Sequence, residues 1–376
     1  MTHLTTAAAR PPAVASDRGR IALAHEWLDS RAGSEKTFEA LAQIFPSADL
    51  YALTDSLGSD FDSAGRPVTT TFLDRMGRSR RGRALQLPLM PLAWRTVTHE
   101  RYDLVITSSH ACVKGFRPGR TATHLSYCHT PARYVWDRHD RRHPLQVAAD
   151  IGPRQALRRW DRRSTSWVDD FAANSTAVAD RIREYYDRDA RIIPPPVDTT
   201  FFTPGPKAAN PAPYVLACSR FIPYKRLDLA ILAADRLGIP IVLAGSGPAE
   251  GALRATAATV SVPVTFVSRP SDEALRDLYR GAAAFIFPAL EDFGIVAIEA
   301  QACGTPVVGL AAGGSLDTVI DGSTGALAEQ QDVESFADAL LRALDIDDRT
   351  ACVTHAQAFS RDCFDRRVAQ WVDDVA

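Results

Sequence analysis

The stretch AAAFIFPALEDFGIVAIEAQACGTPVVGLA, residues 282–311, holds two apolar runs on either side of a helix-compatible segment. The runs at 282–289 and 305–311 are short and continuously apolar, which is typical of strands covered on both faces of a parallel sheet. Gly294 is expected to open the helix, because it follows the end of the first run. A strand, a helix and a second strand in this order form the repeating unit of α/β folds.

The same alternation extends along the chain from residue 20. Strand-like runs are expected at 20–27, 49–54, 102–109, 123–130, 170–176, 191–197, 214–221, 239–247, 262–268, 282–289 and 305–311. Helices are expected between them, among others at 33–45, 177–186, 225–238 and 271–282. The pattern predicts an α/β protein built from doubly wound parallel sheets.

One stretch dense in Pro and Gly, residues 194–213, interrupts this rhythm and is interpreted as a linker. It separates an N-terminal Rossmann-like domain (20–204) from a C-terminal one (205–359), and the two are expected to face each other across a cleft. Residues 1–19 are expected to form a disordered tail rather than a signal peptide. The amphipathic helix at 360–376 either packs back on the first domain or is an ordinary terminal helix.

Composition excludes several classes of protein. The six cysteines form no CxxC pair, so reduced thiols in a cytosolic protein are expected and a zinc site is not. No apolar stretch reaches about 18 residues, so no membrane span is predicted. A GxGxxG motif is absent, which disfavours a nicotinamide oxidoreductase. The Asp-x-Asp motif at 187–189 is interpreted as part of a solvated surface helix, and no metal or nucleic-acid partner is expected.

Two cations lie at the end of the strand at 214–221 and just after it. Arg220 ends this strand and Lys225 opens the next predicted helix, so both lie at the carboxyl end of a parallel sheet, where such folds bind ligands. Cations at a helix start oppose its macrodipole, so an anion such as a diphosphate is expected beside them. The alternative is that both pair with surface acids. Gly245 follows the next strand and permits close approach of backbone to a ligand.

Two glutamates complete this constellation. Glu291 precedes the predicted helix, and Glu299 lies in its second turn among apolar neighbours. Glu299 is either a helix-start charge that suits the macrodipole or a buried carboxylate with hydroxyl partners. Amides near Gly294 are free to receive an anionic oxygen. A nucleotide sugar, which carries ribose, diphosphate and sugar, would use all these groups.

The segments SRFIPYKRLDLAI (219–231), EDFGIVAIEA (291–300) and ACGTPVVGLAAGGSLDTV (302–319) resemble the signature of retaining GT-B glycosyltransferases of family 4. The resemblance extends from residue 20 through nearly the whole chain. It implies that Arg220 and Lys225 hold the donor diphosphate, Glu299 the ribose and Glu291 the transferred sugar. It also implies donor contacts from the glycine loops and from the amides at the start of the helix, at Gly33, Gly245, Phe293, Gly294 and Ile295.

The first half carries the other motifs of this resemblance. In YCHTPARYVWD (127–137), His129 follows a strand and would lie next to the transferred sugar. Arg133, Tyr134 and Lys114 are expected on the acceptor side. This motif and the segments SSHACVKGF (108–116) and IIPPPVDTTFFTP (192–204) are similar to the bacterial O-antigen-type mannosyltransferase branch. That likeness implies GDP-mannose as donor and a lipid-linked or glycan acceptor.

Residues 75–97 combine the basic residues Arg75, Arg78, Arg80, Arg81 and Arg83 with Leu85, Leu87, Leu89, Met90, Leu92 and Trp94. Basic residues beside apolar ones are typical of a contact with an anionic membrane surface. The alternative is a solvated loop followed by a core helix. A membrane contact would fit a cytoplasmic protein at the inner face of the plasma membrane.

The expected reaction is retaining transfer of a hexose, with His129, Arg220, Lys225 and Glu291 as catalytic residues and no cofactor or metal. The cations would stabilise the leaving diphosphate, and front-side attack follows from the family resemblance. A nucleotide-sugar epimerase on the same fold and a non-catalytic nucleotide-sugar-binding protein are the alternatives.

Overall fold

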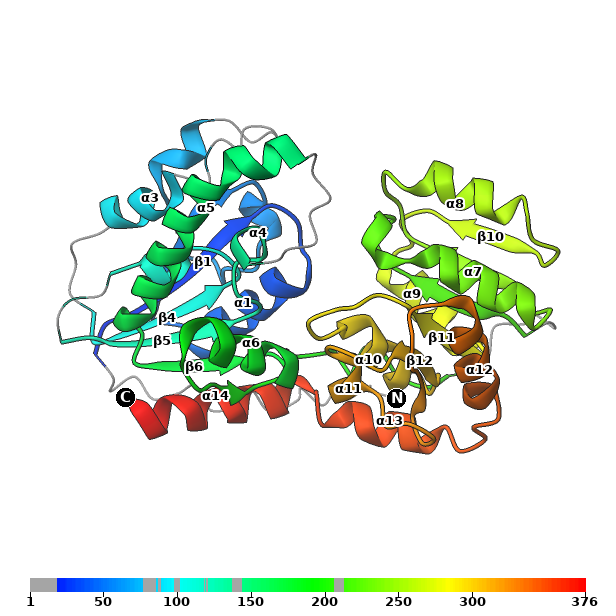
Figure 1. Cartoon of the computed structure of the whole chain (residues 1–376). Coiled ribbons are helices and arrows are strands. Elements are labelled where there is room, and N and C mark those ends of the chain that lie inside the picture. The colour runs from blue at the N-terminus through cyan, green and yellow to red at the C-terminus, as the bar shows by residue number, and fades with distance from the viewer. Residues whose placement is uncertain are drawn as a thin grey trace, which may run out of the picture. The chain divides into compact units, whose positions relative to one another are not determined.

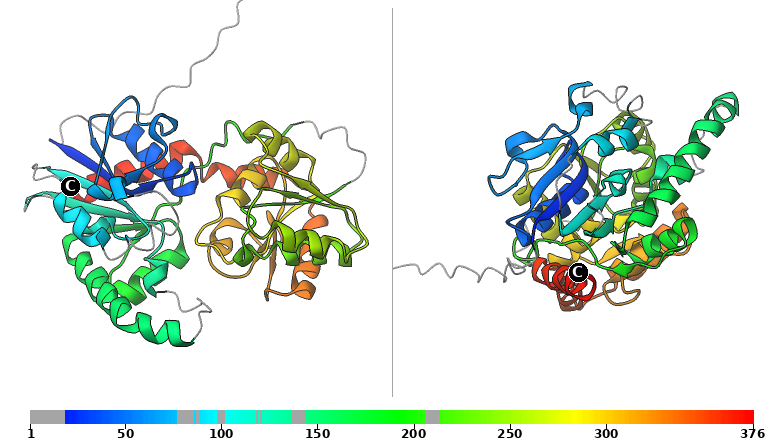
Figure 2. Two further views of the ribbon diagram at one scale, coloured as in Figure 1. Left: turned by 90° about the horizontal axis from the view of Figure 1, so that it is seen from above. Right: turned by 90° about the vertical axis from the view of Figure 1, so that its left-hand side faces the viewer.

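The computed structural model describes residues 19–76, 86, 89–97, 102–117, 119, 121–136, 144–205 and 213–376. The chain divides into two compact units, each built around one parallel sheet (Figures 1 and 2). Unit 1 comprises residues up to 174, 178–193 and 364–376, and unit 2 comprises 175–177 and 194–363. The predicted pair of α/β domains is therefore confirmed.

Unit 1 contains a seven-stranded sheet in the order β3-β2-β1-β4-β5-β6-β7, with every neighbouring pair parallel. Its strands are β1 (Ile21–Leu28), β2 (Asp49–Asp55), β3 (Val68–Thr70), β4 (Leu104–Ser109), β5 (Thr123–Cys128), β6 (Asp170–Ala173) and β7 (Arg191–Ile192). Its α-helices are α1 (Gly33–Ile44), α3 (Met90–Thr96), α4 (Arg133–Trp136), α5 (Pro144–Ser164), α6 (Thr176–Tyr186) and α14 (Arg361–Val375).

Both faces of this sheet are covered, as the continuously apolar strands predict. Successive residues of β1 alternate between two cores: Leu23 packs in the core that contains α1 and α14, and Ala24 packs in the core that contains α3. The last helix contributes Phe364, Val368 and Trp371 to the first of these cores. Helix α14 therefore packs on unit 1 although it follows unit 2 in sequence.

Unit 2 contains a six-stranded parallel sheet in the order β10-β9-β8-β11-β12-β13. Its strands are β8 (Val215–Cys218), β9 (Ile241–Ala244), β10 (Val264–Val267), β11 (Ala284–Phe287), β12 (Val307–Leu310) and β13 (Gly325–Ala328). Its α-helices are α7 (Leu227–Arg236), α8 (Glu250–Ala257), α9 (Asp272–Gly281), α10 (Ile295–Ala302), α11 (Ser315–Thr318), α12 (Val333–Leu344) and α13 (Thr350–Gln357). On β11, Ile286 packs in the core that contains α7 and α12, and Phe285 in the core that contains α9 and α10.

The boundary between the units differs from the predicted one at 204/205. Residues 194–205 belong to unit 2 and pack on its core through Val197 and Phe202. The amide of Val197 donates to the carbonyl of Phe359, and Arg280 donates to the carbonyl of Thr203. The density of Pro and Gly was misleading here, because a segment without helix or strand is still fixed when its apolar side chains are buried.

Candidate functional site

The carboxyl edge of the unit 2 sheet holds an ion pair between Lys225 and Glu291. Lys225 ends a 3₁₀ turn (Pro223–Lys225) that follows β8, and Glu291 lies in the loop between β11 and α10. The two side chains are only 13% and 17% exposed. Lys225, which was expected to bind a phosphate, and Glu291, which was expected to bind a sugar, therefore pair with each other in this structure.

Lys225 does not open the following helix, which corrects the sequence-based placement. Helix α7 begins two residues later at Leu227, and its N-cap is Arg226 in the left-handed conformation with φ of 50°. Arg226 bonds to Asp228, which supplies the acidic first-turn residue that suits the macrodipole. The position of Lys225 therefore depends on the turn after β8 and not on a helix N-terminus.

Glu299 lies inside the same edge, on the fifth residue of α10, and is 6% exposed. The hydroxyl of Tyr279, a fully buried residue on α9, donates to Oε2 of Glu299 at 3.1 Å. Burial raises the pKa of the Cys218 thiol at the end of β8 to about 12, with Glu299 adding to the rise and Lys225 opposing it. Lys225, Glu291, Glu299, Tyr279 and Cys218 thus occupy one site.

The backbone before α10 forms the third part of this site. Gly294 is the N-cap of the helix with φ of 92°, and a Cβ there would lie 2.9 Å from the ring of Phe287. In the described residues, the amides of Phe293, Gly294 and Ile295 make no hydrogen bond. These N–H groups at a helix start are suited to receive an anionic oxygen.

Arg220 and Gly245, which were also expected to contact the nucleotide sugar, lie in the loops after β8 and β9. Arg220 follows β8, is exposed, and makes no side-chain hydrogen bond or ion pair within the described residues. Gly245 follows β9 with φ of 139°, and a Cβ there would lie 2.0 Å from the carbonyl oxygen of Ser219. Gly245 is therefore required for the close packing of the two loops, whether or not a ligand lies beside them.

In unit 1, His129 lies directly after β5 and is about 9% exposed. Its Nε2 is 2.8 Å from the hydroxyl of Ser108, and its carbonyl accepts a bond from Asn174. The rings of His25 and His110 both lie 6.2 Å from the His129 ring. Burial, and next the neighbouring His110, lower the pKa of His129 to about 3. His25 and His110 were not among the expected site residues, although both lie near the carboxyl ends of strands.

Another buried titratable group supports the loop that carries His110. Oε1 of Glu26 accepts bonds from the amides of Ala111 at 2.7 Å and Val113 at 2.8 Å, whereas its Oε2 is buried and has no partner among the described residues. Burial raises the pKa of Glu26 to about 7 in spite of these bonds.

These groups predict that unit 1 loses stability in mild acid. Burial lowers the pKa of His110 and His124 to about 4, and that of His129 to about 3. Between pH 6.5 and about 4 the unfolded chain binds protons that the folded chain does not, so stability is present above pH 6.5 and falls with falling pH. At pH 5 each of these three histidines lowers the free energy of unfolding by about 2 kcal/mol. The proton that Glu26 binds in the folded state raises it again by about 2 kcal/mol.

Urea unfolding at pH 7 and pH 5 measures this difference, and we expect a net loss of a few kcal/mol at pH 5. In Glu26→Gln the compensating proton is absent, so the loss should be larger by about 2 kcal/mol. Equal midpoints for the wild-type protein at both pH values would contradict the prediction.

The expected donor contact Gly33 and the expected acceptor-side residues of unit 1 are placed differently from one another. Gly33 begins α1 after the β1 strand, and Arg133 begins the short helix α4. The side chain of Tyr134 lies outside the described residues. Lys114, in contrast, is 2% exposed, forms an ion pair with Asp161 and donates to the carbonyl of Ala111. Its ammonium is used inside unit 1, which corrects its expected place on a ligand-facing surface.

The segment 75–97 is described only in part, because 77–85, 87 and 88, with Arg78, Arg80, Arg81, Arg83, Leu85 and Leu87, lie outside the described residues. Trp94 on α3 is 1% exposed, so it is a core residue and not an interfacial one. Exposed apolar side chains nevertheless occur here, at Phe72, Met76 and Leu92.

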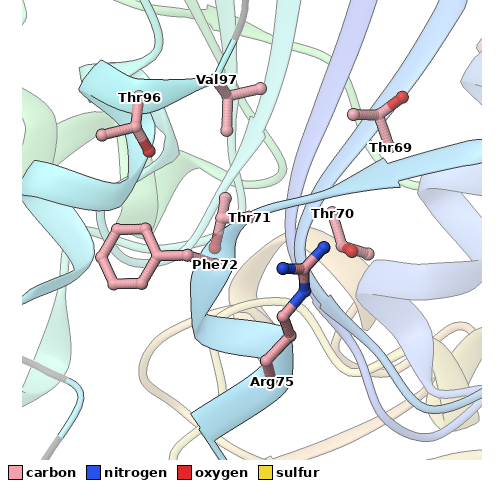
Figure 3. A pocket seen from close by; sticks show the side chains of 7 residues that line it. All are labelled: Thr69, Thr70, Thr71, Phe72, Arg75, Thr96 and Val97. Atoms are coloured by element: carbon pink, nitrogen blue, oxygen red, sulfur yellow. The ribbon is translucent and has the colours of Figure 1, made fainter.

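A pocket of about 440 Å³ opens beside them, lined by Thr69, Thr70, Thr71, Phe72, Arg75, Thr96 and Val97. Figure 3 shows Phe72 and Arg75 extending to opposite sides of their segment. None of the described helices is long and apolar enough to cross a membrane.

The remaining sequence expectations concern metals. The described residues contain no group of three or more His, Cys, Asp or Glu that could hold a metal ion. The Asp-x-Asp motif at 187–189 does not lie on a helix, because α6 ends at Tyr186 and Asp187 adopts the left-handed conformation with φ of 55°.

Two models of glycosyltransferase families match adjacent parts of the chain. The model of glycosyltransferase family 4 matches residues 33–201, and the model of glycosyl transferases group 1 matches residues 200–358. D-inositol 3-phosphate glycosyltransferase of Mycobacterium sp. (strain KMS) is 36% identical over 216 residues, which cover 51% of this chain and 49% of the relative. The enzyme of that name from Mycolicibacterium smegmatis is 32% identical, covering 57% and 55%. The chain thus matches about half the length of these relatives.

Solved structures extend the likeness to the whole chain. Anabaena Alr3699/HepE in complex with UDP and glucose superposes with a TM-score of 0.71 at 18% identity, covering 94% of this chain and 99% of that chain. Sucrose-phosphate synthase from Thermosynechococcus elongatus superposes with a TM-score of 0.72 at 22% identity, covering 95% and 99%. These likenesses, together with the two parallel-sheet units, show the GT-B fold that the sequence predicts.

Proposed function

Because the chain belongs to the glycosyltransferases of group 1 and family 4, we propose that it transfers a hexose from a nucleotide diphosphate sugar to an acceptor hydroxyl, with retention of configuration. The observation that carries this proposal is the gathering of Lys225, Glu291, Glu299 and the free amides before α10 at one edge of unit 2. These groups match the parts of a nucleotide sugar.

Glu299 is the proposed ribose contact. A carboxylate has about four lone-pair sites, so Glu299 can accept from the hydroxyls of a ribose while it also accepts from Tyr279. Its position at the carboxyl edge of the unit 2 sheet, around Cys218 together with Lys225, supports this role, because such folds bind ligands at that edge.

The ion pair between Lys225 and Glu291 has a further consequence for binding. A diphosphate would attract Lys225 away from Glu291, which would leave this carboxylate, only 17% exposed, without its partner. Hydroxyls of the transferred sugar would then be its replacement donors. The complete nucleotide sugar should therefore bind better than the nucleotide alone, since the nucleotide opens the pair without supplying those hydroxyls.

The proposed chemistry places developing charge on the leaving diphosphate. Lys225, Arg220 and the amides of Phe293, Gly294 and Ile295 would stabilise that charge without a metal ion. His129 and Gly33 in unit 1 would serve the transferred sugar and the donor phosphate, and Arg133 and Tyr134 the acceptor. The acceptor hydroxyl would attack from the face of the departing diphosphate.

Mannose from GDP-mannose is the donor we propose, supported by the resemblance of the unit 1 motifs to mannosyltransferases; UDP-sugars are the alternative. A lipid-linked or glycan acceptor is proposed with it, at the cytoplasmic face of a membrane. The exposed Phe72, Met76 and Leu92 beside Arg75 support a membrane contact in unit 1.

A thermal-shift panel of GDP-mannose, GDP, UDP-glucose and ADP-glucose tests the proposal. A donor at a hundredfold excess over its Kd should stabilise the fold by about 2.7 kcal/mol, which raises the Tm by several degrees. Glu299→Ala should lose most of this shift, because the ribose loses its acceptor. The control Glu334→Ala, which removes an exposed ion pair with Arg236, should retain it. The proposal fails if none of the nucleotide sugars raises the Tm.

The products separate transfer from epimerisation. Incubation with donor alone should give at most slow release of free sugar with the anomeric configuration retained. Conversion of the donor into an isomeric nucleotide sugar would instead identify an epimerase.

A further inference from the structure

Three neighbouring strands of unit 1 are joined by a chain of side-chain hydrogen bonds at the carboxyl edge of the sheet. His25 on β1 is paired in register with Ser108 on β4, and His129 follows β5, the next strand. Nδ1 of His25 lies 3.0 Å from the Ser108 hydroxyl and 3.1 Å from the Ser108 carbonyl oxygen. The same hydroxyl lies 2.8 Å from Nε2 of His129.

The carbonyl oxygen fixes the direction of this chain. A carbonyl only accepts hydrogen bonds, so the proton of neutral His25 must be on Nδ1. That N–H also meets the Ser108 hydroxyl, which therefore accepts from His25. Its single proton is then free to be donated to Nε2 of His129, which lies within hydrogen-bond distance on its other side. Nε2 of His129 is then an acceptor, and the proton of neutral His129 is left on Nδ1.

Both rings remain neutral at physiological pH, which makes the position of this proton matter. Burial lowers the pKa of His25 well below its ordinary value, with His110 and His129 adding to the effect, and lowers that of His129 to about 3. Phe38 stacks on the His25 ring at 5.0 Å, and His110 lies 5.4 Å from it.

We propose that His25 and Ser108 are positioning residues that hold the proton of His129 on Nδ1, so that His129 presents an N–H donor to its ligand. Among the described residues this Nδ1 has no hydrogen-bond partner. It is also absent from the set of fully buried atoms without a partner, so it is accessible to a ligand. If the proposed glycosyl transfer holds, the group that it meets is an oxygen lone pair of the donor sugar or of the acceptor.

This assignment limits what His129 can do chemically. A neutral ring with its proton on the accessible nitrogen donates a hydrogen bond but cannot take a proton from an acceptor hydroxyl through that atom. The base must then be another group, and the leaving diphosphate of the donor is the one that front-side attack provides. His129 orients a hydroxyl or ring oxygen of the ligand instead.

The tautomer can be read directly by NMR on the unliganded full chain labelled with ¹⁵N-histidine. His129→Gln identifies the signals of His129 by their loss. In the wild-type protein we expect His129 to be protonated on Nδ1 alone. In Ser108→Ala and in His25→Leu the hydrogen-bond chain that holds the proton of His129 on Nδ1 is broken, and we expect a mixture of tautomers. His25→Asn, whose side-chain amide places an N–H near the position of Nδ1, should restore the wild-type pattern.

Activity provides the second readout. In Ser108→Ala and His25→Leu we expect kcat to fall at least tenfold with a smaller change in the KM for the donor, and His25→Asn should recover most of the rate. An Nε2–H tautomer of His129 in the wild-type protein would overturn the proposal, and so would an unchanged Nδ1–H tautomer in both variants. Because the tautomer is read without ligand, failure of the donor panel would remove the proposed function and leave this result standing.

Discussion

Replacing Asp161 by alanine is expected to lower the free energy of unfolding of unit 1 by about 3–5 kcal/mol. The carboxylate of Asp161 and the ammonium of Lys114 are each 2% exposed and form an ion pair. The second oxygen of Asp161 accepts bonds from the indole of Trp136 at 2.7 Å and the hydroxyl of Tyr186 at 2.8 Å. The substitution would leave a buried cation, the buried hydroxyl of Tyr186 and the partly buried indole of Trp136 without this acceptor.

The pKa of Lys114 indicates that this cation would stay charged in the wild-type protein. Burial alone would lower it, but the Asp161 carboxylate more than offsets burial, and the pKa is raised above its ordinary value. The penalty in the variant therefore arises from an uncompensated charge. In the double variant Lys114→Met/Asp161→Leu no charge is buried, and we expect it to regain more than half of the lost stability.

Urea unfolding, followed by tryptophan fluorescence, measures these changes. The control is Asp189→Ala, which removes an exposed ion pair with Arg183 whose side chains are 66% and 88% exposed. We expect it to change stability by less than about 0.5 kcal/mol. A loss of under 1 kcal/mol in Asp161→Ala would show that the buried pair is not an essential support of unit 1.

The fold could be predicted because its central strands carry their own signal. Strands such as β11 are apolar at every position and buried at every position, so the pattern alone identifies them. The two strands that the sequence analysis missed, β3 and β13, are both edge strands. β3 is only partly buried, and β13 has the sequence GALA, without any β-branched residue. Such strands depend on a neighbour in the sheet and not on local sequence.

The site could be predicted only as far as charges near strand ends reveal it. Lys225, Glu291 and Glu299 were expected together at one edge of unit 2, and the structure brings them together. Tyr279, which donates to Glu299, belongs to another helix and carries no signal of its own in the sequence.

Lys114 was predicted to face a ligand on the acceptor side, but it is buried in an ion pair. Its partner Asp161 lies 47 residues later on α5. Partners so distant in sequence are determined by packing, and a pattern read along the chain does not contain them.

Replacing Lys225 by alanine is expected to reduce turnover about a hundredfold or more while the fold persists. The ammonium is the only cation that the structure bonds to Glu291 among the described residues. Its loss would leave the leaving diphosphate without this charge in the transition state, and Glu291 without its partner in the free protein. Glu291→Gln in the same background should restore stability but not turnover, since it removes the unpaired carboxylate without replacing the cation.

Steady-state kinetics with saturating donor separate the two ways in which Lys225 could act. An interaction made mainly in the transition state lowers kcat and kcat/KM together, whereas uniform binding raises KM alone. We expect the first pattern, because negative charge on the diphosphate grows as the glycosidic bond breaks. The control Arg254→Ala removes an exposed ion pair with Glu250 on α8 and should leave both constants unchanged. Turnover of Lys225→Ala within threefold of the wild-type value, with its Tm preserved, would exclude Lys225 as the cation that stabilises the leaving group.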